Sequence, residues 1–152
     1  MRVHTVRPFQ FIGPRKYPDA CSHFARGIIA VERGELSEVR VGNLDAVRDY
    51  LDVHDGVRAM WLIARAAQPG DVFNICSGTG RPLREILRML MTIAGVNAPV
   101  IEDPQRLRPL DVPVVVGDNT RLRRLGWEPA IAIKQTLADI LDYWRTHQQA
   151  PA

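Results

Sequence analysis

The sequence has 152 residues, a formal net charge of +3, 46% hydrophobic and 24% charged residues, as in an ordinary globular protein. No apolar run approaches the roughly 20 residues that cross a bilayer, and basic residues alternate with acidic ones, which excludes a nucleic-acid-binding tract. The two cysteines, Cys21 and Cys76, and the four histidines lack the spacing of a metal site or a disulfide framework. We therefore expect a single cytoplasmic domain over residues 1–152 with no metal.

The first half of the chain predicts strands and helices in alternation. They are a strand over 2–7, a loop over 8–18, a helix over 20–33 ended by Gly34, and strands over 38–41 and 47–51 around a turn at 42–43. Asp52 has the character of an N-cap and starts a further helix. The apolar residues at helical spacing in that helix are expected to face the core: Val57, Met60, Trp61 and Ala64.

The second half continues the alternation. It predicts a strand over 72–76, a helix from about residue 82, a strand over 99–101, a brief helix over 120–125 capped by Asp118, and a final helix over 133–147. Strands that alternate with helices indicate an α/β or α+β domain with a small mixed sheet.

Three arginines occupy positions suited to an anion. Arg48 lies between a Gly-Asn turn and a helix N-cap, where a guanidinium can give two parallel hydrogen bonds to a diphosphate. A surface ion pair with a neighbouring aspartate is the competing interpretation. Arg106 and Arg108 lie in a loop rich in proline, and such a stiff loop loses less conformational entropy when it binds an anion. An ordinary solvated loop is the competing interpretation.

The segment Phe9-Gln10-Phe11 directly follows the first predicted strand. Loops at the carboxyl ends of strands are where α/β proteins bind ligands, and the Gln10 amide can hydrogen-bond a sugar or a phosphate. Phe9 and Phe11 could equally belong to the core, which is the favoured role for Phe11.

Two catalytic patterns are incomplete in this sequence. Gly78-Thr79-Gly80 follows a predicted strand as in a dinucleotide-binding loop, but Leu83 stands at the third glycine position, so we do not expect a cofactor there. None of the three tyrosines is followed by a lysine four residues later.

Seven segments, in order along nearly the whole chain, resemble the extended short-chain dehydrogenase/reductases, the NAD-dependent epimerase/dehydratase family. The resemblance is closest to the GDP-6-deoxy-4-keto-mannose reductases and GDP-mannose 4,6-dehydratases. The segments are Arg7-Pro8, Gly42-Asn43-Leu44, Arg48-Asp49-Tyr50, Asp52-Val53-x-Asp55, Phe73-Asn74-Ile75-Cys76-Ser77-Gly78, Arg108-Pro109-Leu110-Asp111-Val112-Pro113 and Gly126-Trp127-Glu128-Pro129.

The resemblance implies roles for individual residues. Arg48 and Arg108 would bind the phosphates or ribose of the nucleotide, Val41 would line the base pocket, and Asp111 would contact or support the nucleotide. Gln10 replaces an asparagine that meets the substrate diphosphate in this family, which implies a different reach toward the substrate. Phe9 is the candidate cofactor-binding residue of this chain.

The resemblance also implies a division of labour. This chain would be the C-terminal substrate domain, without the Rossmann domain that binds NAD(P) and carries the catalytic residues. Residues 1–18 would adjoin that sheet, so we expect a Rossmann-domain partner or a homodimer formed through this region. The chain would bind a GDP-deoxyhexose, or another nucleotide-diphosphate sugar, without catalysing its reaction. A stand-alone non-catalytic binding module and a degenerate remnant are the alternatives.

Overall fold

The computed structural model describes residues 3–106 and 112–147, which form a mixed α/β structure with parallel strand pairs. The chain divides into two compact units, each assembled from three separate stretches of sequence. The first unit contains Met1–Ile12, Val47–Arg81 and Val114–Ile133, and the second contains the segments that alternate with them. None of the described helices is both long and apolar enough to cross a membrane.

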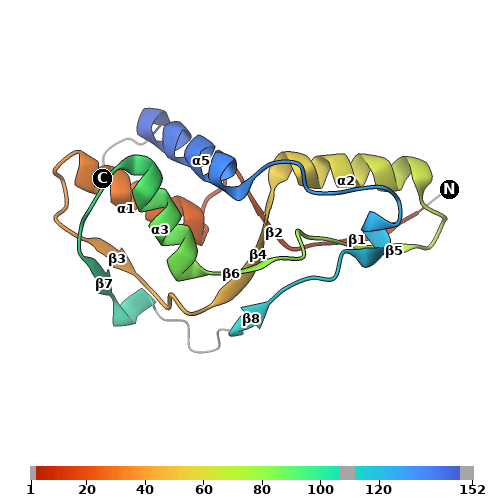
Figure 1. The fold of residues 1–152 in the computed structure, drawn as a ribbon, viewed down its shortest axis with the longest axis horizontal. Helices are drawn as coiled ribbons and strands as arrows, with labels where there is room; N and C mark the ends of the chain where they lie inside the picture. The colour runs from red at the N-terminus through yellow and green to blue at the C-terminus, as the bar shows by residue number, and fades with distance from the viewer. Residues whose placement is uncertain (1–2, 107–111, 148–152) are drawn as a thin grey trace. The chain divides into compact units, whose positions relative to one another are not determined.

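In the first unit, strands that lie far apart in the sequence pair with each other. β1 (Thr5–Pro8) pairs in parallel with β5 (Val72–Ile75), and a second sheet has the order β2-β4-β6 with β8 also paired to β4. The bounds of this second sheet are Gln10–Ile12 for β2, Val47–Asp52 for β4, Gly80–Pro82 for β6 and Val114–Val115 for β8. α2 (Val53–Ala66) runs along β1 and β5, as Figure 1 shows, and α4 (Thr120–Arg123) lies against β5.

A single apolar cluster joins these elements. Leu51 of β4, Ile63 of α2, Phe73 of β5 and Trp127 after α4 are all buried in it. Val6 and Phe11 pack against the same cluster from β1 and β2, so core packing for Phe11 is confirmed.

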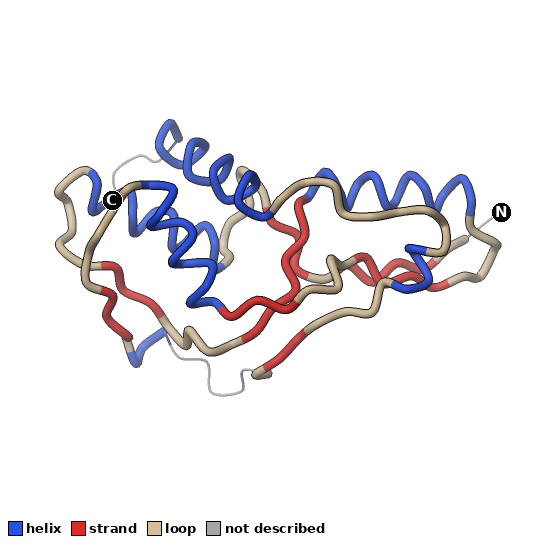
Figure 2. The backbone as a smooth tube through the Cα atoms, viewed as in Figure 1, coloured by secondary structure: helices blue, strands red, loops and turns tan. Residues whose placement is uncertain are grey.

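The second unit pairs β3 (Val39–Val41) in parallel with β7 (Val100–Glu102), and a short 3-10 turn, η1 (Pro104–Arg106), follows β7. Its helices are α1 (Ala20–Glu32), α3 (Leu83–Ala94) and α5 (Ile133–His147), drawn in blue in Figure 2. α1 packs against both α3 and β3.

Gly34 ends α1 as predicted, and the helix begins at an N-cap, Asp19, that the sequence analysis did not assign. The Asp19 carboxylate accepts hydrogen bonds from the amides of Cys21 and Ser22, at 2.8 and 3.2 Å, which satisfies two of the donors that a helix leaves free at its start. Gly34 has a φ of 72°, the left-handed conformation that commonly ends a helix.

The predicted inward face of α2 is wrong. Val57, Met60 and Trp61 are 59%, 38% and 65% exposed, and Ala64 is exposed as well. The helix instead turns small residues toward the strands: a Cβ at Gly56 would lie 2.5 Å from the Phe11 ring. Such close approach requires a small-residue face, so the bulkier apolar stripe of the same helix points outward.

Two other expectations about local structure need correction. The predicted loop over 8–18 contains β2, which the sequence analysis missed because three residues are too few to show a strand pattern. The short helix near residue 120 has Asn119 as its N-cap residue, although the Asp118 carboxylate accepts a hydrogen bond from the Thr120 amide at 2.8 Å.

Candidate functional site

Asp49 is the most densely bonded side chain of the first unit. It is fully buried in β4, and its Oδ1 accepts from the amide and the hydroxyl of Ser77 at 2.7 and 2.6 Å. Its Oδ2 accepts from the amides of Gly78 and Gly117 at 2.9 and 3.1 Å. One carboxylate thus ties the turn after β5 and the segment before α4 to the middle of β4.

The Asp49 contacts also occupy the first amides of the Gly78–Gly80 turn. In phosphate-binding turns, successive backbone N–H groups converge on an external anion. Here the amides of Ser77 and Gly78 converge on the Asp49 carboxylate, an anion that the chain supplies itself. The turn is therefore a structural joint within the first unit.

Two further aspartates of the same segment lie at the start of α2. Asp52 caps the helix by accepting from the His54 amide at 2.7 Å. Asp55 is fully buried and accepts from the amides of Ala130 and Ile131, both at 2.9 Å. Asp49 and Asp52 are the two neighbouring aspartates that could form an ion pair with Arg48. Each of them accepts a hydrogen bond from a backbone amide.

Arg48 and Gln10 share one face of the β2–β4 pair. The register places Gln10 beside Tyr50, and Arg48 precedes Tyr50 by two residues, so all three belong to the same face because side chains alternate along a strand. Asp49 points to the opposite face. Arg48 is half-buried, and its Nη1 donates to the Val47 carbonyl at 2.8 Å, while Gln10 is exposed. Two of the predicted site residues are therefore brought together by backbone register.

Phe9, the predicted cofactor contact, is half-buried beside Gly117 and Cys76. A Cβ at Gly117 would lie 2.8 Å from the Phe9 ring and 2.4 Å from the Cys76 sulfur. Burial, followed by the negative charge of Asp49, raises the pKa of the Cys76 thiol to about 12. A thiol that stays protonated at neutral pH is a poor nucleophile.

In the second unit, Val41 ends β3 next to the loop that carries Arg106. The Val41 side chain is buried, and its carbonyl accepts from the Asp103 amide at 2.8 Å. A Cβ at Gly42 would lie 2.7 Å from the Arg106 carbonyl oxygen, so this position requires glycine. The Arg106 side chain donates from Nε to Asp103 at 3.3 Å.

His23, on the first turn of α1, belongs to the same neighbourhood. Burial, and then the positive charges of Arg106 and Arg26, lower the pKa of His23 below its ordinary value. Arg106 thus lies near His23 while its own side chain is paired with Asp103. Sequence reasoning missed His23, because nothing in the sequence relates it to Arg106, more than 80 residues away.

Arg108 and Asp111, the other two predicted site residues, lie outside the described residues. Among the described residues, no cluster of three or more His, Cys, Asp or Glu side chains could hold a metal ion.

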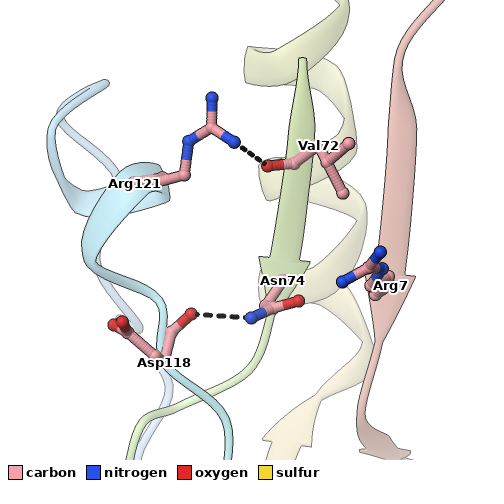
Figure 3. Close-up of a pocket in the computed structure, with 5 residues that line it drawn as sticks. All are labelled: Arg7, Val72, Asn74, Asp118 and Arg121. Carbon is pink, nitrogen blue, oxygen red and sulfur yellow. Dashed lines mark hydrogen bonds between the residues drawn. The ribbon is translucent and has the colours of Figure 1, made fainter. Parts of the chain in front are cut away.

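A surface pocket of about 220 Å³ in the first unit is lined by Arg7, Val72, Asn74, Asp118 and Arg121 (Figure 3). Its polar groups hold α4 to β5: Asn74 Nδ2 donates to the Asp118 carbonyl at 3.0 Å, and Arg121 Nη1 donates to the Val72 carbonyl at 3.0 Å. The pocket is small and contains none of the predicted site residues, so we assign it a structural role.

The sequence matches a known protein family over most of its length. A family model described as GDP-mannose 4,6 dehydratase matches residues 1–140. The chain belongs to this family. It corresponds to the C-terminal part of an extended short-chain dehydrogenase/reductase, as the resemblance predicted.

Individual relatives support the assignment. The chain is 36% identical to the GDP-6-deoxy-D-mannose reductase of Pseudomonas aeruginosa over 95% of its own length and 49% of the relative's. It superposes on the structure of RMD from the same organism complexed with NADPH, with a TM-score of 0.89 and 35% identity, covering 97% of this chain and 50% of that one.

The fold is shared more widely than the GDP-sugar enzymes. A UDP-glucose 4-epimerase from Thermotoga maritima, solved with UDP-glucose, matches with a TM-score of 0.82 and 29% identity, covering 96% of this chain and 47% of that one. The chain spans about half the length of these relatives.

Proposed function

We propose that this chain is the nucleotide-sugar-binding part of an NAD(P)-dependent reductase or dehydratase, with a GDP-deoxyhexose as the favoured ligand, and that it does not catalyse the reaction by itself. The observation that carries the proposal is the placement of Arg48. Asp49, the residue after Arg48, accepts four hydrogen bonds that fix this part of β4, and the register puts Arg48 on the same face as Gln10.

Recognition of the nucleotide sugar would follow the roles that the family resemblance implies for individual residues. Arg48 and Gln10 would donate hydrogen bonds to phosphate oxygens from the β2–β4 face, because a guanidinium matches the planar geometry of two such oxygens. Val41 would border the base, Arg108 would bind phosphate or ribose, and Asp111 would support the nucleotide. The names of the relatives, a GDP-6-deoxy-D-mannose reductase and GDP-mannose 4,6-dehydratases, support guanine as the base.

The described residues do not fit a dinucleotide cofactor. The one glycine turn that follows a strand in the manner of a cofactor loop, Gly78–Gly80, has its first amides occupied by Asp49. NAD(P) would therefore be held by another part of the enzyme, with Phe9 the nearest candidate contact from this chain. The cytoplasmic location also stays a prediction.

Isothermal titration calorimetry of the chain with GDP-mannose, GDP, UDP-glucose and NADPH tests the proposal. Arg48→Ala should weaken GDP binding about tenfold to a hundredfold, the usual loss for a charge-assisted hydrogen bond to a phosphate. Arg65→Ala, which removes an exposed arginine from α2, is the matched control and should leave the affinity unchanged. An equal effect of both substitutions would refute the role of Arg48.

A stand-alone binding module and a degenerate remnant are the competing functions. A remnant should bind neither GDP-mannose nor GDP even when the rest of a related enzyme is supplied. A stand-alone module should bind GDP-sugars as tightly as a full-length relative does.

A further inference from the structure

One side of α3 borders a surface groove that the proposed function does not use. The groove has a volume of about 500 Å³, and all of its lining residues belong to the second unit. Its apolar lining comes from the loop before β4, from α3 and the turn after it, and from the start of β7: Leu44, Leu87, Met91, Val96 and Val100. Among the described residues, none of the predicted site residues lines it. Its volume is within the ~300–1,000 Å³ of small-molecule sites.

Backbone hydrogen bonds hold both ends of the groove. At the start of α3, the Arg84 amide donates to the Leu44 carbonyl at 3.1 Å, which ties the loop before β4 to the helix. At the end of α3, Gly95 has a φ of 70° and the Val96 amide donates to the Met91 carbonyl at 3.0 Å. The loop and the turn are thus both anchored to the helix, so the groove exists before any ligand binds.

The charged part of the lining is cationic. Arg84 and Arg88 lie one helical turn apart on the same side of α3. Arg84 forms an ion pair with Asp45. Arg88 is exposed, and within the part of the chain that the structure describes no carboxylate pairs with its guanidinium. The described lining contains no acidic side chain, so its charge favours an anion.

We propose that this groove binds a single-chain amphiphile with one acidic head group, of the class of medium-chain fatty acids. The carboxylate faces Arg88, because a guanidinium without an acidic partner gains a charge-assisted hydrogen bond there. The acyl chain covers Leu87 and Met91, because each methylene that leaves water for an apolar surface stabilises the complex.

A protein partner or a second copy of the chain fits the groove less well. Ten residues line it, whereas a stable protein–protein interface uses about 20–30 residues on each side. The charge of the lining also distinguishes between small ligands. A cationic amphiphile would bring like charge to Arg84 and Arg88, and a neutral one would leave the Arg88 charge unpaired.

Isothermal titration calorimetry of the chain with decanoate and with decyltrimethylammonium tests the proposal. The two probes have chains of similar length and opposite head-group charge, and both are used below the concentrations at which they form micelles. Decanoate should bind with a dissociation constant of about 1 mM or lower. The cationic probe should bind at least about tenfold more weakly, because it meets two arginines.

Variants of the groove assign the binding to its residues. Arg88→Gln keeps part of the apolar stem but removes the charge, and it should weaken decanoate binding about tenfold. Met91→Ala should weaken both probes about threefold to tenfold, because it removes apolar surface from the groove. Arg65→Gln, at an exposed position on α2 in the first unit, is the matched control and should leave both affinities unchanged.

Several results would overturn the proposal. They include no saturable binding of decanoate, equal affinities for the two probes, and equal effects of Arg88→Gln and Arg65→Gln. A dimer of the chain that Met91→Glu abolishes would assign the groove to a second copy. Binding to phosphatidylglycerol vesicles but not to decanoate would assign it to a lipid surface.

Titration with GDP separates this proposal from the proposed function. Saturating GDP should not displace decanoate, and displacement would assign the groove to the nucleotide site. Arg48→Ala should leave decanoate binding unchanged. A chain that binds decanoate but not GDP therefore refutes the proposed function alone, and one that binds GDP but not decanoate refutes the groove alone.

Discussion

Replacing Asp49 with asparagine should destabilise the first unit strongly, although it changes only one atom of the side chain. In the wild type, the two carboxylate oxygens accept four hydrogen bonds from Ser77, Gly78 and Gly117. Asparagine offers one oxygen and one NH₂ group. In the orientation that retains more hydrogen bonds, the asparagine oxygen still accepts from the amides of Gly78 and Gly117. The NH₂ group then faces the Ser77 amide, which is also a donor.

The size of the effect follows from this geometry. The Ser77 hydroxyl can turn and accept from the new NH₂ group, but the Ser77 amide is left without an acceptor, and the remaining bonds lose their charge. One buried unsatisfied donor together with weaker bonds to the glycine amides costs about 3 kcal/mol. At a urea dependence of about 2 kcal/mol per molar, the unfolding midpoint should fall by about 1.5 M.

Urea unfolding followed by tryptophan fluorescence measures this shift. Trp127 is buried in the first unit and reports on its unfolding. Asp45→Asn is the matched control, because Asp45 is 79% exposed and forms a surface ion pair with Arg84, which should contribute little. A shift for Asp49→Asn no larger than that of the control would refute the structural role of this carboxylate.

Other predictions concern packing and charge. Gly56→Ala should destabilise the chain by about 1–2 kcal/mol, because its Cβ would overlap the Phe11 ring, whereas Gly27→Ala should stabilise it by about 0.5–1 kcal/mol, because its Cβ meets only ordinary contacts in α1. Opposite shifts in thermal midpoint check this pair, and shifts of the same sign contradict it. Arg106→Ala should raise the pKa of His23 in an NMR titration, since removing the cation favours the charged ring. Because folding lowers the pKa of His23, its contribution to the free energy of unfolding is lost as the pH falls below the ordinary pKa of a histidine. A gain in stability from His23 on acidification would contradict the lowered pKa.

The elements with strong local signals were predictable from the sequence. Gly34 ends α1 and Asp52 begins α2 as predicted, because helix capping depends on residues next to each other in the chain. The family was equally predictable, since seven ordered segments carry it.

The orientation of α2 could not be predicted in the same way. Periodicity identifies an apolar stripe but not which of two stripes meets the sheet, and that choice depends on the Phe11 ring opposite Gly56. The role of Asp49 was hidden for a similar reason: its partners lie 28 and 68 residues away and are backbone amides, which leave no mark on the sequence pattern.

The candidate site was predictable only in part. The shared face of Arg48 and Gln10 follows from alternation along β2 and β4 once the pairing of these strands is known, and the sequence does not show that pairing. The roles assigned to Val41, Arg108 and Asp111 stay predictions.

Titration of the chain with GDP-mannose is the most direct test of the account. The account predicts saturable binding that GDP competes away, that UDP-glucose competes away less effectively, and that Arg48→Ala weakens while the Asp45→Asn control does not. Binding of NADPH in place of GDP-mannose, or binding that is unchanged in Arg48→Ala, would contradict the account.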